Sequence, residues 1–306
     1  MTNTQLFRIK SVSEYHRLAG LPKPEHPLIS VVNFDGIKQI LSDEPINIVS
    51  DLYSITLKHA SGVKIKYGQQ QYDCDEGVLF FLSPNQVFSV EVGENPTIES
   101  SGWMLVIHPD FLFNTALAKT IKQYDFFDYS VNEALFLSQK EEATINSIVE
   151  NIKYEYHSNI DKFSKSIMIT HLENLLSYAD RFFNRQFITR EKSNHQILQR
   201  LEELLTNYFD SDDLITKGLP TVQFIAEQLN VSPKYLSGLL RTLTGQNAQQ
   251  HIHDKLIEKA KEKLSTTDLS VSEIAYQLGF EHSQSFSRLF KAKSGFGPSE
   301  FRASFN

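Results

Sequence analysis

The chain has 306 residues, 41% of them hydrophobic, which is enough for two packed domains. Its net charge of −7 is unevenly divided: the first 219 residues carry 20 Lys/Arg and 29 Asp/Glu, the rest ten and eight. One cysteine, Cys74, excludes an internal disulfide and a cysteine-based zinc site. Met1–Lys10 lacks the apolar core of a signal peptide, and the longest apolar run, Val78–Leu82, is too short to span a bilayer, so we expect a cytoplasmic protein without membrane association.

Residues 28–108 contain short β-branched and aromatic runs separated by Gly, Pro, Asn and Asp, a pattern that predicts strands. The expected strands are Leu28–Phe34, Tyr53–His59, Val63–Tyr67, Val78–Leu82, Gln86–Val92 and Trp103–His108. Before them, residues 1–25 predict a short helix and an extended lead-in. Short strands at this spacing favour a small barrel or jelly roll, without choosing among barrel types.

The predicted barrel carries no catalytic or metal-binding signature. A metal-dependent barrel enzyme needs clustered histidines with a carboxylate, whereas the histidines of this region are far apart in sequence: His16, His26, His59 and His108. His251 and His253 form a His-x-His pair, but positions i and i+2 of a helix point in different directions. Nucleophile motifs, phosphate loops and paired carboxylates are missing too, so we expect no enzyme activity, no cofactor and no metal.

An aromatic-rich segment follows the strands, at Phe111, Phe113, Tyr124, Phe126, Phe127, Tyr129 and Phe136. These rings either wall an apolar ligand pocket or plug the barrel against the following helices, and we favour the second. The barrel interior is the expected place for a small-molecule effector. Its candidate lining residues are Tyr53, Tyr67, Phe80, Phe88 and Trp103.

Two long apolar stripes predict an α-helical hairpin at about residues 139–186. One stripe can pack on the barrel, but two exceed what a small domain needs, so the hairpin is a candidate dimer interface. The alternative is that both helices pack only on their own barrel. The polar segment 185–194 is the predicted linker, and Gln196–Phe209 predicts an amphipathic helix that braces the helices after it.

Leu269–Phe301 predicts a helix-turn-helix. Ser270 with Glu273 forms a capping-box pattern at the start of the first helix. Gly279 supplies the backbone freedom that a tight turn needs, and Phe286 and Phe290 give the second helix an inner face. Its other face is polar and free of acids, with Gln284, Ser287, Arg288 and Lys291 at i, i+3, i+4 and i+7, after Ser283. Such a face suits a helix in the major groove, where Arg reads guanine and Gln reads adenine.

Thr221–Gly245 partly repeats this segment at an offset of about 49 residues. Ser232-Pro233 is an N-cap followed by proline at the first helical position. The predicted outward residues have the same spacing: Lys234, Ser237, Gly238 and Arg241. The intervening residues 247–265 predict a rigid helix of roughly 27 Å. Successive major grooves lie about 34 Å apart, so one chain could read two adjacent grooves.

Residues of about 195–306 resemble the DNA-binding domain of the AraC/XylS family of bacterial transcription regulators. The resemblance lies in Ile274-Ala275, Leu278-Gly279-Phe280, Phe286–Lys291, Ser294-Gly295 and the segment from Gly297-Pro298 to Phe301-Arg302. It implies a double helix-turn-helix, with units at 221–245 and 270–295, that binds a direct-repeat-like site. It also implies an α+β fold class, in which a cupin-like sensing and dimerisation domain (1–184) with the helical hairpin precedes the linker and an all-α domain (195–306).

We therefore expect a sequence-specific regulator that binds double-stranded promoter DNA as a homodimer under control of a small-molecule effector. RNA polymerase is a further candidate partner. One alternative is a regulator without an effector, acting through dimerisation or a protein partner. Another is a metal-dependent cupin enzyme fused to a DNA-binding tail.

Overall fold

The computed structural model describes residues 6–34, 46–60, 65–67, 70–72, 77–90, 100–129, 133–158, 161–189, 191–211 and 213–304. The chain divides into two compact units, Met1–Gln186 and Phe187–Asn306. Within the described ranges, no helix combines the length and the apolarity needed to cross a membrane.

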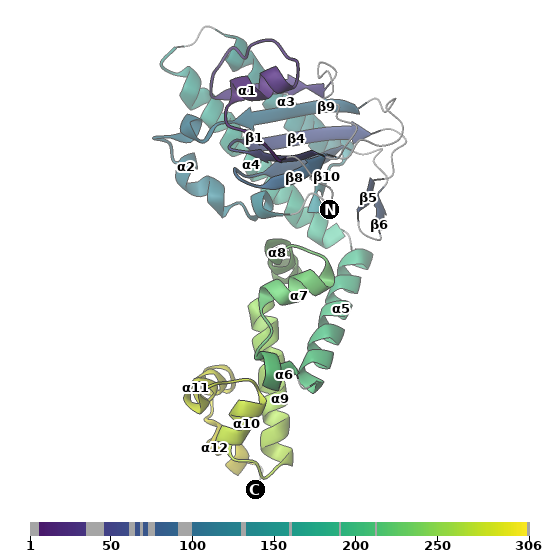
Figure 1. Cartoon of the computed structure of the whole chain (residues 1–306), viewed down its shortest axis with the longest axis vertical. Helices are drawn as coiled ribbons and strands as arrows, with labels where there is room; N and C mark the ends of the chain where they lie inside the picture. The colour runs from purple at the N-terminus through teal and green to yellow at the C-terminus, as the bar shows by residue number, and fades with distance from the viewer. Residues whose placement is uncertain are drawn as a thin grey trace. The chain divides into compact units, whose positions relative to one another are not determined.

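The N-terminal unit is built on an antiparallel five-stranded sheet in the order β10-β7-β4-β9-β2 (Figure 1). Its strands are β2 (Ile29–Asn33), β4 (Tyr53–Ala60), β7 (Val78–Leu82), β9 (Ser100–Ile107) and β10 (Leu135–Phe136). A second sheet has the order β1-β3-β8, from β1 (Leu6–Ile9), β3 (Ile46–Ser50) and β8 (Val87–Val90). Strands β5 (Ile65–Tyr67) and β6 (Gln70–Tyr72) pair antiparallel. All six predicted strands are confirmed, whereas β1, β3, β6 and β10 were not predicted.

The central strand β4 is buried on both faces. Tyr53, Ile55 and Leu57 share one face, because side chains alternate along a strand, and they pair with Ile107, Leu105 and Trp103 of β9. This face packs on helices: the Trp103 Nε1–H donates to Asn146 Oδ1 at 2.8 Å. The opposite face packs on the smaller sheet, where Val106 and Met104 of β9 join a cluster with Ile9 and Ile48.

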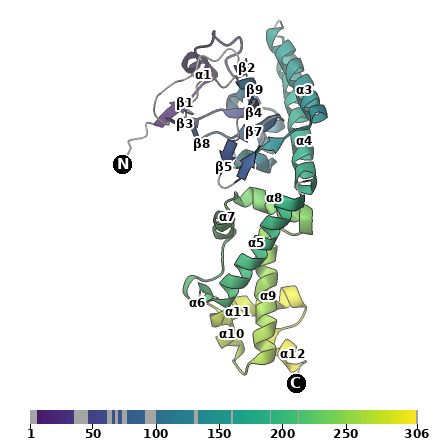
Figure 2. The same ribbon diagram turned by 90° about the vertical axis from the view of Figure 1, so that its right-hand side faces the viewer.

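The helix layer is the predicted hairpin, formed by α3 (Gln139–His157) and α4 (Ser164–Thr189), beside the five-stranded sheet (Figure 2). Shorter helices connect the strands: α1 (Val12–Leu18), η2 (Pro109–Leu112), α2 (Leu117–Thr120), η3 (Ile121–Gln123) and η4 (Asp125–Asp128). The short helix expected in residues 1–25 is confirmed as α1.

The predicted closed cupin-like barrel is not confirmed. The five-stranded sheet is open, with the two-residue strand β10 at one edge and β2 at the other. Its apolar faces are instead covered from two sides, by α3 and α4 and by the smaller sheet. A sheet covered in this way has apolar partners without closing on itself.

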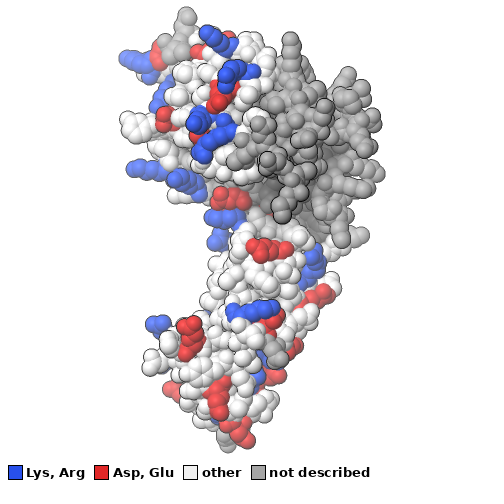
Figure 3. All heavy atoms as spheres, in the orientation of Figure 1, with Lys and Arg blue, Asp and Glu red and all other residues white. Residues whose placement is uncertain are grey.

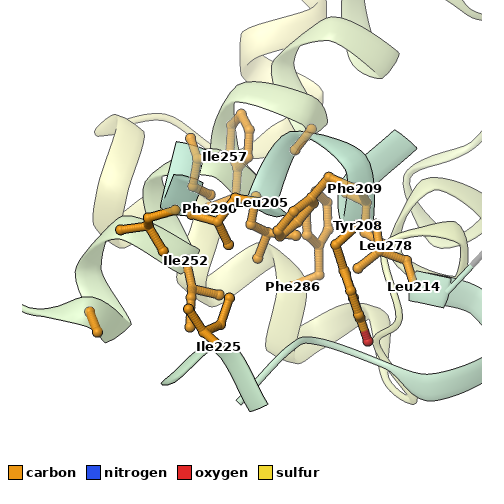
Figure 4. Packing of buried hydrophobic residues seen from close by; sticks show 14 of the residues in the cluster. Leu205, Tyr208, Phe209, Leu214, Ile225, Ile252, Ile257, Leu278, Phe286 and Phe290 are labelled. Atoms are coloured by element: carbon orange, nitrogen blue, oxygen red, sulfur yellow. The ribbon is translucent and has the colours of Figure 1, made fainter. Parts of the chain in front are cut away.

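The C-terminal unit is all-helical. Its helices are α5 (Glu191–Asp210), α6 (Asp213–Lys217), α7 (Val222–Leu229), α8 (Pro233–Thr244), α9 (Ala248–Thr266), α10 (Val271–Gln277), α11 (Ser283–Ser294) and α12 (Pro298–Ala303). Figure 1 shows α7 and α8 at one end of α9 and α10 to α12 at the other. Their buried side chains form one cluster, in which residues of both halves meet around α9 (Figure 4).

The predicted linker, residues 185–194, differs from the expectation. Residues up to Thr189 continue α4, and Glu191 begins α5. Two contacts stabilise the helical conformation of this segment. Arg185 donates to both carboxylate oxygens of Glu141, at 3.0 and 2.7 Å. Asn194 Nδ2 donates to the Phe187 carbonyl oxygen. The polar composition of the segment therefore reflects helix surface.

Candidate nucleic-acid interface

The second helix-turn-helix unit is formed by α10 and α11, as predicted. The Ser270 backbone N–H donates to Glu273 Oε2 at 2.7 Å, and the Glu273 backbone N–H donates to Ser270 Oγ at 3.2 Å, which confirms the capping box. Ile274 of α10 and Phe286 and Phe290 of α11 are fully buried. Packing between these side chains, supported by a defined start of α10, fixes how α11 projects from the unit.

Gly279 makes the turn between α10 and α11 and has the left-handed φ of +80°. A Cβ at this position would lie 2.7 Å from the Leu214 carbonyl oxygen and 3.0 Å from the Gly218 Cα. Both obstacles are backbone atoms, so a side chain cannot be accommodated by a change of rotamer. The expectation that glycine is needed at this turn is confirmed.

The first unit, α7 and α8, has the same plan with different cap residues. Asn230 occupies the position equivalent to Gly279 and is also left-handed, with φ +56°. Ser232 Oγ accepts from the Tyr235 backbone N–H at 3.2 Å, and Pro233 is the first residue of α8, as predicted. Leu236, Leu239 and Leu240 are fully buried, and Leu243 is half-buried.

The residues predicted to contact DNA form the outer faces of α8 and α11. Lys234, Arg241, Gln284, Arg288 and Lys291 are exposed, and the smaller members are half-buried: Ser237, Gly238, Ser283 and Ser287. Ser287 Oγ donates to the Ser283 carbonyl oxygen at 3.0 Å, so this hydroxyl offers a ligand mainly its lone pairs.

Three of the cations on these faces have no partner among the residues that the structure describes. Within the described ranges, no carboxylate or side-chain hydrogen bond engages Arg241, Arg288 or Lys291. Elsewhere in the unit, basic and acidic side chains are interspersed on the face that Figure 3 shows. Because α8 and α11 contain no Asp or Glu, their outer faces are positive surfaces in a unit that carries ten Lys/Arg and eight Asp/Glu from residue 220 onward.

Asp254 of α9 connects the two helix-turn-helix units, a role that no sequence pattern indicated. Gln246, between α8 and α9, donates from Nε2 to Asp254 Oδ2 at 2.8 Å. Lys293, near the end of α11, donates from Nζ to Asp254 Oδ1 at 2.9 Å. One carboxylate therefore holds the segment after α8 and the last turn of α11 to the same point of the connecting helix.

Replacing Asp254 with asparagine should remove a modest, pH-dependent contribution to stability. Desolvation raises the pKa of Asp254, but hydrogen bonds from Lys293 and Gln246 outweigh it and hold the pKa below its ordinary value. A lowered folded-state pKa stabilises the protein above the unfolded pKa of about 4, and this contribution is lost as pH falls through the folded pKa. The partly exposed pair is worth about 0.5–1 kcal/mol.

Urea denaturation of Asp254→Asn and wild type checks this expectation. The difference in unfolding free energy should be present at pH 7 and shrink at pH 3. Glu258→Gln is the matched control, because Glu258 pairs locally with Lys255 on the same helix. An equal effect of both variants, or a difference that does not change with pH, would contradict the role of Asp254.

The candidate effector residues do not converge on one place. Tyr53 and Trp103 face the helix layer, but Trp103 pairs with Leu57, four residues along β4 from Tyr53, a separation of about 13 Å. Phe80 pairs with Thr56 and so lies on the opposite face of the sheet. Tyr67 and Phe88 lie in β5 and β8, and their side chains are outside the described part of the structure.

The aromatic segment after the strands has two roles. Phe126 packs between the sheet and the helices, with ring-centroid distances of 4.4 Å to Phe81 and 5.4 Å to Phe183. This is the packing role that we favoured. Tyr124 and Phe127, however, line an open pocket together with Tyr53. In the described ranges, no group of three or more His, Cys, Asp or Glu is arranged to hold a metal ion.

Comparison with known proteins places the C-terminal unit in a family. A helix-turn-helix domain family model matches residues 225–304. The transcriptional activator AarP of Providencia stuartii is 32% identical over 109 residues, which cover 36% of this chain and 73% of AarP. The raffinose operon regulatory protein RafR of Pediococcus pentosaceus is 37% identical over 84 residues, 28% of this chain and 30% of RafR.

Among solved structures, the C-terminal domain of AraT, a response regulator from Geobacillus stearothermophilus, is 31% identical. The match covers 35% of this chain and 84% of that domain, with a TM-score of 0.31. The chain covers less than half the length of the first curated relatives, RafR and the Escherichia coli regulator YijO. The match to AarP, most of whose length it covers, together with the family model shows that the chain belongs to the AraC/XylS family of helix-turn-helix proteins.

Proposed function

We propose that the chain reads two adjacent major grooves, with α8 in one groove and α11 in the next. The observation that carries this proposal is that both helices expose acid-free faces while sharing one core through α9. On these faces Arg241, Arg288 and Lys291 have no partner in the described part of the chain. The 19 residues of α9 extend about 28 Å, close to the 34 Å between successive grooves on one side of DNA.

The residues divide into base-reading and phosphate-binding groups. Arg288 is the principal base-reading residue, since a guanidinium can donate two hydrogen bonds to guanine, and Gln284 can pair with adenine. Lys291, Lys234, Arg241 and the serines Ser237, Ser283 and Ser287 complete the contacts with phosphates or base edges. Gly238 offers no side chain, so α8 contributes less sequence discrimination than α11.

A genome-fragment pull-down tests the proposal. Purified protein is incubated with sheared genomic DNA at moderate salt, and the retained fragments are sequenced. We expect a motif with two blocks about 10–10.5 base pairs apart, centre to centre. Retention without a motif, both with and without added cell extract, would contradict sequence-specific reading by these helices.

Dimerisation through the helical hairpin is the second part of the proposal. Three large apolar side chains near the start of α4 are exposed, Phe113 at 68%, Phe163 at 56% and Ile167 at 41%. Lys165 of α4 donates from Nζ to the Phe113 carbonyl oxygen at 2.9 Å, which places Phe113 beside this helix. Soluble monomers seldom expose adjacent apolar groups of this size, whereas dimer interfaces are built from them.

Ile167→Asp should weaken the dimer at least tenfold, because a carboxylate would be buried in an apolar contact. Sedimentation equilibrium of variant and wild type measures the effect. Ser177→Asp, an exposed position about 15 Å further along α4, is the control for added charge. A wild-type chain that remains monomeric at high micromolar concentration would support the alternative, in which both helices pack only within their own domain.

Control by a small molecule in the N-terminal unit is the third part of the proposal. An effector that binds the two conformational states of a regulator with different affinities shifts their populations and so changes the affinity for DNA. One rival is a regulator without an effector, which acts through dimerisation or a partner such as RNA polymerase. Thermal stabilisation by members of a metabolite library would argue against that rival. A metal-dependent enzyme with a DNA-binding tail is the other rival, and metal analysis of the purified protein addresses it.

A further inference from the structure

A pocket of about 460 Å³ opens where β4 begins, on the side of the five-stranded sheet that faces the helices. Its lining comes from the first residue of β4, the turn between β7 and β8, and the η3 and η4 segments. It is thus separate from the space between the two sheets, where the effector was expected. Its size is within the range of small-molecule sites.

Tyr53 gives the pocket a hydroxyl group that is available to a ligand. The residue is only 8% exposed, and within the described part of the chain its hydroxyl has no hydrogen-bond partner. Its ring is held edge-on by Phe127 at a centroid distance of 5.3 Å. Burial, together with the charge of Asp128, raises the pKa of Tyr53, so the phenol keeps its proton and can donate a hydrogen bond. The hydroxyl oxygen itself is open to solvent in the pocket, where it can donate to a bound acceptor.

Asn85 is a second polar group in the lining, and its side chain is held in place. The Arg8 Nη2 donates to Asn85 Oδ1 at 2.7 Å and to Asp51 Oδ1 at 2.6 Å. The backbone of Asn85 is left-handed, with φ +68°, and its N–H donates to the Ser50 carbonyl oxygen at 2.7 Å. With Oδ1 occupied, the amide Nδ2 is the donor that remains for a ligand. Such a fixed group lowers the entropic cost of binding.

The charges and walls of the pocket define the class of ligand. Lys122 and Asp128 are exposed residues of opposite sign, whereas the largely buried Tyr53 offers an uncharged hydroxyl. A ligand charge buried there would have no counterion, which is costly. The rings of Tyr124 and Phe127 supply flat apolar surfaces. We infer that this pocket binds a small, neutral, ring-shaped molecule that carries hydroxyl groups.

The pocket is connected to α4 through adjacent residues. Phe127 lines the pocket, and its neighbour Phe126 stacks on Phe183 of α4 at 5.4 Å with an interplanar angle of 14°. Helix α4 continues to Thr189, beyond the end of the N-terminal unit at Gln186. An occupied pocket would thus act on the helix that leads into the DNA-binding unit. This regulatory meaning rests on the proposed effector control, whereas ligand binding itself does not.

Saturation-transfer difference NMR on the full chain tests the site, with benzyl alcohol as the probe. Tyr53→Phe should bind it about five- to tenfold more weakly, because one hydrogen bond is lost. The variant should fold as well as wild type, since the deleted hydroxyl has no partner in the described part of the protein. Tyr154→Phe, which removes a hydroxyl from an exposed residue of α3, is the control and should change nothing.

Charged probes of the same size test the ligand class. Benzoate and benzylammonium should bind more weakly than benzyl alcohol, and either binding more tightly would overturn the class. Equal binding of benzyl alcohol by Tyr53→Phe and Tyr154→Phe would overturn the site. DNA affinity is measured in parallel, with the probe and with hydroxylated metabolites. If the probe binds at Tyr53 but none of these compounds changes DNA affinity, the binding site is supported and effector control is contradicted. If DNA affinity responds to a metabolite equally in Tyr53→Phe and wild type, this pocket is not the effector site.

Discussion

Gly279→Ala is expected to lower the free energy of unfolding of the C-terminal unit by about 2–5 kcal/mol. The left-handed φ of +80° costs alanine about 1–2 kcal/mol, and the contact of Cβ with backbone adds roughly another 1–3. The Leu214 carbonyl oxygen would lie 2.7 Å from the new Cβ. The neighbouring Gly218 cannot easily retreat, because the Tyr208 hydroxyl donates to its carbonyl oxygen at 2.9 Å.

Gly295→Ala is the matched control for Gly279→Ala. Gly295 has nearly the same φ, +83°, but nothing lies within 4 Å of the position of its Cβ. Alanine there should cost only the backbone part, about 1–2 kcal/mol. Urea denaturation followed by circular dichroism measures both variants. Equal destabilisation by the two would mean that close packing of α6 against the turn contributes nothing.

Arg288→Ala is expected to weaken binding to the preferred DNA site by about 1–3 kcal/mol, or roughly 5- to 150-fold, and to relax the preference at one base pair. The side chain is exposed on α11 without a partner in the described part of the protein, so its removal should leave stability almost unchanged. Competition binding with a set of single-base variants of the site measures the effect.

Arg288→Lys separates the two roles that an arginine can have on DNA. Lysine keeps the charge but cannot make the paired hydrogen bonds of a guanidinium. The variant should keep most of its non-specific affinity while losing the base preference. Lys255→Ala, which removes a cation paired with Glu258 on α9, should have little effect. If Arg288→Ala lowered affinity for all sequences alike, Arg288 would be a phosphate contact.

The helix-turn-helix units could be predicted because their signals are local. Ser270 and Glu273 are three residues apart, and the left-handed turn needs only Gly279. The Asp254–Lys293 pair joins residues 39 positions apart on two helices, and no periodic pattern marks either residue. Such a contact depends on how α11 packs against α9, which only the folded unit reveals.

The N-terminal unit was predicted strand by strand, but its assembly was not. Short apolar runs indicate where strands are, whereas strand order and register depend on pairings between distant segments. The pairing of Thr56 with Phe80 and of Leu57 with Trp103 puts two of the candidate effector residues on opposite faces. Tyr53, a predicted effector residue, lines a pocket on the helix side of the sheet.

Hydroxyl-radical footprinting of the full chain on a selected DNA site tests reading of two adjacent grooves most directly. Protection is expected in two patches about 10–10.5 base pairs apart on one face of the duplex for each bound chain. In Arg288→Ala, the patch assigned to α11 should weaken first as protein is diluted, while the other persists. A single protected patch per chain, or protection that follows no sequence, would contradict the proposal that α8 and α11 both enter the major groove.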